Sequence, residues 1–146
     1  MTEEEAEGFE LDARLASDCL PMGELDCSRL LLMNNALLPW FILVPVTQAT
    51  ELYQMPQARQ LQLLAEINLL SDYINSEFAV EKLNVAAIGN IVRQLHVHIV
   101  GRHSSDYCWP GVVWGAPQTE PYSDREVQRI KASLNTRLNS HIKLHA

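Results

Sequence analysis

The feature that most constrains the fold of this chain is an alternating run of polar and apolar residues, Gln94-Leu-His-Val-His-Ile-Val100. Side chains of an extended strand point alternately to the two faces of a sheet. The alternation therefore predicts a strand over Ile91–Val100, with one face in the core and the other polar. The apolar face would hold Leu95, Val97 and Ile99, and the polar face Gln94, His96 and His98.

Two apolar segments earlier in the chain predict a β-hairpin. Ser28–Met33 and Leu37–Val46 are separated by Asn34-Asn35, a composition typical of turns. Pro39 restricts the start of the second segment to an edge or to the beginning of a strand, and Pro45 is expected to end it.

Two helices are expected. Over Pro56–Phe78, apolar residues recur at steps of three and four, which predicts a helix with one buried face. That stripe would comprise Leu61, Leu64, Ile67, Leu70 or Ser71, Ile74 and Phe78. A second helix is expected from about Pro121 to Leu138, with Ser123 as its N-cap and Glu126 completing a capping box.

The remaining segments also fit an α+β fold. Lys82–Ala87 predicts a strand, Phe9–Ala16 a short helical segment, and Pro21-Met22-Gly23 a turn. Residues 1–8 are expected to form a flexible acidic tail. The order of hairpin, long helix, two strands and C-terminal helix predicts a single domain over residues 1–146, with a mainly antiparallel sheet of about five strands.

Composition excludes some classes of protein. The 146 residues carry 11 Lys and Arg against 18 Asp and Glu, a net charge of −7, which argues against binding long nucleic acid or an anionic membrane. The three cysteines form no Cys-x-x-Cys pair, which suits a reducing compartment. The acidic N-terminus does not resemble a signal peptide, and no apolar segment reaches the length of a membrane helix. A cytoplasmic protein is expected.

The histidine pair is open to three interpretations. The first is an ordinary half-exposed strand with surface histidines. The second is a metal site in which His103 or Cys108 adds a ligand to His96 and His98. The third is nucleophilic catalysis at phosphorus, because neutral imidazole is a competent nucleophile and the glycine turn at Gly89 lets main-chain N–H groups approach an anion.

At this point the sequence resembles a known family. Gln94-Leu-His-Val-His-Ile-Val100, with Gly89-Asn90 before it and Gly101-Arg102 after it, is similar to the motif of the histidine triad (HIT) superfamily. The resemblance covers Ser28–Arg102 and includes the run from Pro39 to Pro45. With Trp109-Pro-Gly and Trp114-Gly115, the chain looks similar to a bacterial HIT subgroup of diadenosine polyphosphate hydrolases.

The resemblance implies roles for individual residues. His96 would attack the α-phosphorus of a small nucleotide, His98 would contact the phosphate, and Asn90 would contact the phosphate or the leaving group. It also implies a HIT-like fold, a base pocket around Ser28–Leu43, a homodimer, and chemistry that needs no metal or other cofactor. Asn84 and Arg102 are further candidates for substrate binding; the alternatives are a hydrogen bond at the strand end for Asn84 and a solvated arginine at the strand end for Arg102.

Two positions depart from the HIT pattern. Gln94 stands where the first histidine is expected, and it can donate and accept hydrogen bonds but cannot take up a proton. Ile91 stands where many members carry a small hydroxyl residue. The expected function is therefore a nucleotide hydrolase or transferase; the alternative is a HIT-fold nucleotide-binding protein whose catalysis Gln94 has weakened.

Overall fold

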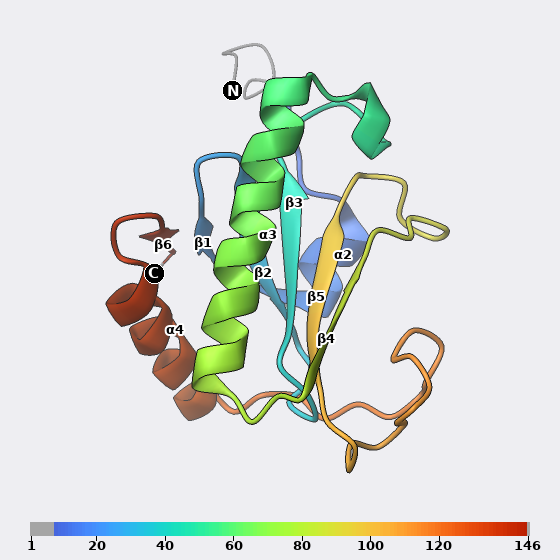
Figure 1. The fold of residues 1–146 in the computed structure, drawn as a ribbon, viewed down its shortest axis with the longest axis vertical. Coiled ribbons are helices and arrows are strands. Elements are labelled where there is room, and N and C mark those ends of the chain that lie inside the picture. The colour runs from blue at the N-terminus through green and yellow to red at the C-terminus, as the bar shows by residue number, and fades with distance from the viewer. Residues whose placement is uncertain (1–7, 146) are drawn as a thin grey trace.

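A computed structural model describes residues 8–145, in which one six-stranded sheet has the order β4-β5-β3-β2-β1-β6. Every neighbouring pair of strands is antiparallel (Figure 1). The predicted α+β fold is confirmed. The strands are β1 (Cys19–Glu24), β2 (Ser28–Met33), β3 (Trp40–Pro45), β4 (Lys82–Ala86), β5 (Val97–Arg102) and β6 (Lys143–Leu144). The helices are α2 (Ala13–Asp18), the short 3₁₀ helix η1 (Leu52–Gln54), α3 (Gln57–Glu77) and α4 (Asp124–Leu138).

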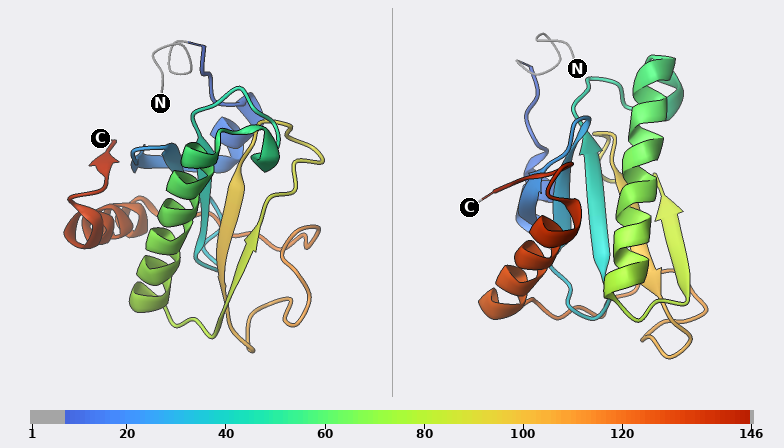
Figure 2. Two further views of the ribbon diagram at one scale, coloured as in Figure 1. Left: turned by 45° about the horizontal axis from the view of Figure 1, so that its top comes forward. Right: turned by 60° about the vertical axis from the view of Figure 1, so that its left-hand side comes forward.

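The centre of the sheet is buried on both faces because β3 is apolar at every position. Phe41 and Leu43 pack into a core with α3 and α4, whereas Ile42 and Val44 pack into a second core on the opposite face. Figure 2 shows α3 and α4 on one side of the sheet and α2 on the other. The second core is the one that meets the histidines, since Ile42 pairs with His98 across β3 and β5.

Several elements lie where the sequence predicts them. The hairpin of β2 and β3 is confirmed, and β3 ends at Pro45 as expected. Helix α4 begins after Ser123, whose hydroxyl accepts a hydrogen bond from the main-chain N–H of Glu126. No helix within residues 8–145 combines the length and apolarity needed to cross a bilayer. Most of the predicted acidic tail lies outside the described residues.

The buried stripe predicted for α3 is wrong in its first half. Leu61 and Leu64 are 60% and 52% exposed, and the helix buries Leu63 there instead, whereas Leu70 and Ile74 are buried as predicted. It also buries two charged residues, because Glu66 accepts a hydrogen bond from the N–H of Cys27 and Arg59 donates to the carbonyl of Val46. Hydrophobic periodicity cannot identify a buried face that carries charged side chains.

Two local predictions are corrected. The strand expected over Ile91–Val100 begins only at Val97, so residues 89–96 form a loop that approaches β5. Pro21-Met22-Gly23 is not a turn but lies inside β1, where the pairing with β2 shifts register between Pro21 and Gly23. Gly23 is needed there because a Cβ would lie 2.5 Å from the main-chain oxygen of Lys143.

Candidate active site

The start of β5 brings His96 and His98 together. His96 is the last loop residue before the strand, and His98 is the second residue of the strand. Their ring centroids are 4.9 Å apart, and each residue is only 6% exposed. An ordinary solvated strand would leave such side chains in water, so the two rings form a desolvated pair.

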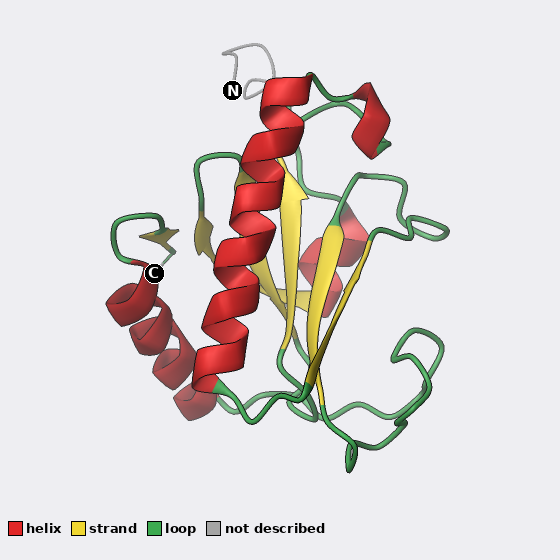
Figure 3. Ribbon diagram, in the orientation of Figure 1, coloured by secondary structure: helices red, strands yellow, loops and turns green. Residues whose placement is uncertain are grey.

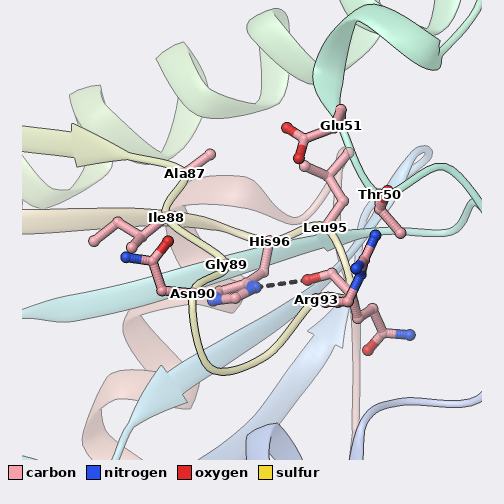
Figure 4. Close-up of a pocket in the computed structure, with 10 residues that line it drawn as sticks. Thr50, Glu51, Ala87, Ile88, Gly89, Asn90, Arg93, Leu95 and His96 are labelled. Atoms are coloured by element: carbon pink, nitrogen blue, oxygen red, sulfur yellow. Dashed lines mark hydrogen bonds between the residues drawn. The ribbon is translucent and has the colours of Figure 1, made fainter.

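The ring of His96 is held by the main chain. Its Nδ1 atom lies 2.7 Å from the carbonyl oxygen of Gln94 (Figure 4). A carbonyl oxygen can only accept a hydrogen bond, so Nδ1 carries the proton. In the neutral ring the other nitrogen, Nε2, therefore keeps a free electron pair. This is the tautomer that a nucleophilic histidine requires.

The ring of His98 is held in the opposite tautomer. The indole N–H of Trp40 donates to its Nδ1 over 3.0 Å, so Nδ1 of His98 is unprotonated. The proton of the neutral ring then lies on Nε2, which is a hydrogen-bond donor. Trp114 packs edge-on against the same ring, with centroids 5.3 Å apart. Burial is the main cause that lowers the pKa of His98 to about 4, and the charge of His96 contributes in the same direction.

His98 is accordingly expected to stay neutral throughout the physiological range. In an NMR titration, its ring resonances should not move between pH 8 and 5, and they should begin to shift only near pH 4. An unfolded histidine takes up its proton near pH 6.5. The free energy of unfolding should therefore fall as the pH drops from about 6.5 towards 4. A His98 signal that titrates near pH 6.5 in the folded protein would contradict this assignment.

The two histidines line a cavity of about 690 Å³. This size is typical of pockets for small ligands. Its walls are largely apolar and aromatic, and Arg14 and Asp18 of α2 also line it. The wall residues include Leu15, Trp40, Ile42, Val92, Val113 and Trp114. Gly89, whose φ of 69° favours glycine, turns the chain so that Asn90 also borders the cavity.

Sequence reasoning missed most of these wall residues. The base pocket was expected around Ser28–Leu43, and Met33, Trp40 and Ile42 of that region do line the cavity. Helix α2 and the segment around Trp114 complete it from distant parts of the chain. Figure 3 shows that this second segment, between β5 and α4, contains no helix or strand, and it therefore has no periodicity to detect.

Asn84 and Arg102 lie elsewhere. Arg102 ends β5 and donates from Nε to Asp106 over 2.7 Å, from Nη1 to Asn84 over 2.9 Å, and from Nη2 to the carbonyl of Gly111 over 2.8 Å. These bonds anchor the segment that follows β5. The structure does not bring the two residues to the histidine pair, and we assign them a structural role instead of substrate binding.

A metal site would need a third ligand beside His96 and His98. Among residues 8–145, no three side chains of His, Cys, Asp or Glu lie close enough together to hold a metal ion. His103 lies beyond the far end of β5, and its Nδ1 hydrogen-bonds the hydroxyl of Ser105. Cys108 is next to the guanidinium of Arg102, with Sγ 3.5 Å from Nη2.

Comparison with protein families finds a HIT domain over residues 16–105. The chain belongs to the HIT family. HIT-family membership is consistent with a nucleotide-binding protein or with a nucleotidyl hydrolase or transferase. Comparison with curated proteins found no match.

Three solved HIT structures share the fold. A histidine triad protein from Marinobacter aquaeolei is 40% identical, with 91% of this chain and 98% of that chain covered and a TM-score of 0.86. One from Sinorhizobium meliloti is 38% identical, with 90% of this chain and 98% of that chain covered and a TM-score of 0.87. One from Bradyrhizobium japonicum is 37% identical, with 89% of this chain and 98% of that chain covered and a TM-score of 0.86.

In this HIT domain, Gln94, the residue at the first triad position, lines a pocket together with His96 but is not aligned with the two histidines on one strand face. The side chain of Gln94 accepts a hydrogen bond from the N–H of Asp12 and donates one to the carbonyl of Glu10, both over 2.8 Å. The expected alternation fails here because the chain is not a strand before Val97. Gln94 therefore holds the segment before α2 against the histidine loop through these two hydrogen bonds. Asp12 of that segment also caps α2.

Gln94→Glu is expected to loosen this segment. The variant keeps the acceptor for Asp12 but sets a carboxylate oxygen against the carbonyl of Glu10, which should cost about 1–3 kcal/mol. Amide hydrogen exchange over residues 10–18 should become faster. Gln48→Glu is the matched control, because Gln48 also donates to this segment, at the carbonyl of Gly8. Equal exchange in both variants would contradict a special role for Gln94.

Proposed function

We propose that this HIT protein is a nucleotidyl hydrolase or transferase that acts at the α-phosphorus of small nucleotides, with dinucleoside polyphosphates among its substrates. One observation carries the proposal, namely the opposite tautomers of two adjoining buried rings. Nε2 of His96 is free to attack, whereas Nε2 of His98 can donate a hydrogen bond to a phosphoryl oxygen. An ordinary solvent-exposed strand has no need of hydrogen bonds that fix the two rings in opposite tautomers.

In the proposed reaction, the electron pair on Nε2 of His96 forms a bond to the α-phosphorus. The bond from phosphorus to the bridging atom breaks, and the leaving group takes that electron pair. The ring becomes a nucleotidyl-imidazolium, and the carbonyl of Gln94 stabilises its positive charge through Nδ1–H. Water then attacks the phosphorus, releases the nucleoside monophosphate and two protons, and restores the neutral ring. No step uses a metal or another cofactor.

The larger cavity supports a nucleoside as the bound half. Its aromatic and apolar walls, with Trp114 and Ile42 among them, suit a planar base. Asp18 and Arg14, which also line it, can contact a ribose or a phosphate. His98 is kept neutral by burial, so it contributes a directed hydrogen bond without a charge.

The test is to incubate the protein with ADP, diadenosine tetraphosphate and adenosine 5′-phosphoramidate. The expected result is release of AMP, together with an adenylyl adduct detected by mass spectrometry after rapid quenching. Saturable binding without AMP or adduct would contradict the proposal. It would favour the alternative, a nucleotide-binding protein in which the structural use of Gln94 has replaced a catalytic one.

We also propose a homodimer. Strand β4 is an edge of the sheet, with Val85 on it 47% exposed, and Leu61 and Leu64 of α3 are exposed as well. Such edges are normally covered, because they otherwise pair with other chains. Sedimentation should give the mass of two chains, and Val85→Lys should shift the equilibrium towards a single chain. A wild-type protein that sediments as one chain at micromolar concentration would contradict this proposal.

A further inference from the structure

A second, smaller cavity adjoins the histidine loop. It has a volume of about 360 Å³ and lies between the turn at Thr50-Glu51 and the loop formed by residues 87–96 (Figure 4). The two cavities share four lining residues, Ile88, Gly89, Asn90 and His96. They therefore meet at the side chain that we propose as the nucleophile.

The two cavities differ in chemistry. The larger one is walled by aromatic and aliphatic groups, whereas the smaller one is lined by hydrogen-bonding groups such as those of Thr50, Asn90 and Arg93. A ligand that spanned both would need an apolar half and a polar half. A nucleoside joined to a phosphate chain or to a similar polar group has this character.

Arg93 supplies the positive charge of the smaller cavity. Within residues 8–145, its guanidinium has no ion-pair partner within 4 Å, and it makes no hydrogen bond to another side chain. Glu51 also lines the cavity but forms no ion pair with Arg93; its main-chain carbonyl accepts the N–H of Gln54, and its own N–H donates to the side chain of Gln54. The guanidinium of Arg93 is therefore free to bind a ligand, and the Glu51 carboxylate does not neutralise it through an ion pair.

We propose that this smaller cavity receives the departing part of the substrate, and that Arg93 and Asn90 bind it there as a phosphate or polyphosphate. The inference rests on the proposed function. In a displacement at phosphorus, the attacking and leaving groups lie on opposite sides of the reacting atom. A substrate with its nucleoside in the larger cavity and its α-phosphorus at His96 thus needs separate space for the leaving group.

The charge of Arg93 also suits the reaction. When a phosphoanhydride breaks, negative charge develops on the leaving phosphate, and a guanidinium placed near that oxygen stabilises it. An uncharged leaving group such as ammonia gains nothing from the guanidinium. Arg93 should therefore determine which leaving groups the protein prefers, more than whether the protein reacts at all. Because Arg93 is exposed to solvent, its contribution is expected to be moderate.

The experiment compares two substrates with the same adenylyl half. ADP releases an anionic phosphate, whereas adenosine 5′-phosphoramidate releases ammonia after its nitrogen takes a proton from water. In Arg93→Gln, the ratio of kcat/KM for ADP to that for the phosphoramidate should fall about tenfold. In Glu51→Gln, which removes the negative charge that lines the same cavity, the ratio should rise by a few fold. Arg125→Gln removes an exposed arginine from α4 and should leave the ratio unchanged.

Binding separates the failure of this inference from the failure of the proposed function. ADP should bind more tightly than AMP in isothermal calorimetry, and Arg93→Gln should remove most of that difference whether or not turnover occurs. If wild-type protein releases no AMP from either substrate, the proposed function fails and the binding difference alone decides the subsite. If the ratio and the binding difference both stay unchanged in Arg93→Gln, the subsite is contradicted.

Discussion

His96→Gln is expected to abolish the covalent adduct and to lower AMP release by at least about a thousandfold. Glutamine keeps a polar side chain of similar reach, but its amide nitrogen has no electron pair available to attack phosphorus. The hydrogen bond from Nδ1 to the carbonyl of Gln94 is lost as well. Single-turnover kinetics with ADP, together with mass spectrometry of the quenched protein, measures both effects.

A matched control and a rescue sharpen this test. His103→Gln is the same substitution at a histidine near the far end of β5, and it should leave adduct and rate unchanged. In His96→Gly, added imidazole should restore part of the AMP release, because free imidazole can attack from the vacated space. An adduct that persists in His96→Gln would place the nucleophile elsewhere, and His98 would be the first residue to examine.

The sequence predicted those elements that carry a strong local signal. The hairpin follows from two apolar runs separated by Asn34-Asn35, and α4 follows from its cap at Ser123 and its apolar stripe. Strand β1 was missed because it contains Pro21 and Gly23, residues that usually mark turns, and because only its place between β2 and β6 makes it a strand. Information of that kind lies in the pairing, not in the local sequence.

The site was predictable in the same limited way. The period-two pattern correctly brought His96 and His98 to one place, but the groups that fix their tautomers could not be read from it. One is the indole of Trp40, which lies 58 positions from His98 in the sequence. The other is a main-chain carbonyl, which every residue possesses. The chemical difference between the two rings is therefore a product of the fold.

Arg102 illustrates the opposite error. A basic residue directly after a histidine motif looks suited to bind phosphate, and sequence alone cannot reveal that Asp106 has already neutralised it. Their side chains are only 2% and 1% exposed, and Nε of Arg102 lies 2.7 Å from the Asp106 carboxylate. The hydrogen bond from Arg102 is the main reason that the pKa of Asp106 is lowered to about 2.

Arg102→Met is therefore expected to reduce the stability of the protein and to spare nucleotide binding. The variant leaves the Asp106 carboxylate buried without its cation, which should lower the free energy of unfolding by about 3–5 kcal/mol. Asn84 and the carbonyl of Gly111 also lose their donor. Urea unfolding at pH 7 measures this loss. AMP binding by the folded fraction, measured well below the transition, should match that of the wild type.

The pH dependence of that loss identifies its cause. The folded pKa of Asp106 lies below its ordinary value of 3.8, so the pair stabilises the protein above about pH 4 and stops doing so as the pH falls towards 2. The difference between wild type and Arg102→Met should shrink over that window. Adding Asp106→Leu should recover much of the lost stability at pH 7, because no charge then remains buried. Unchanged stability with weakened AMP binding would instead return Arg102 to the substrate site.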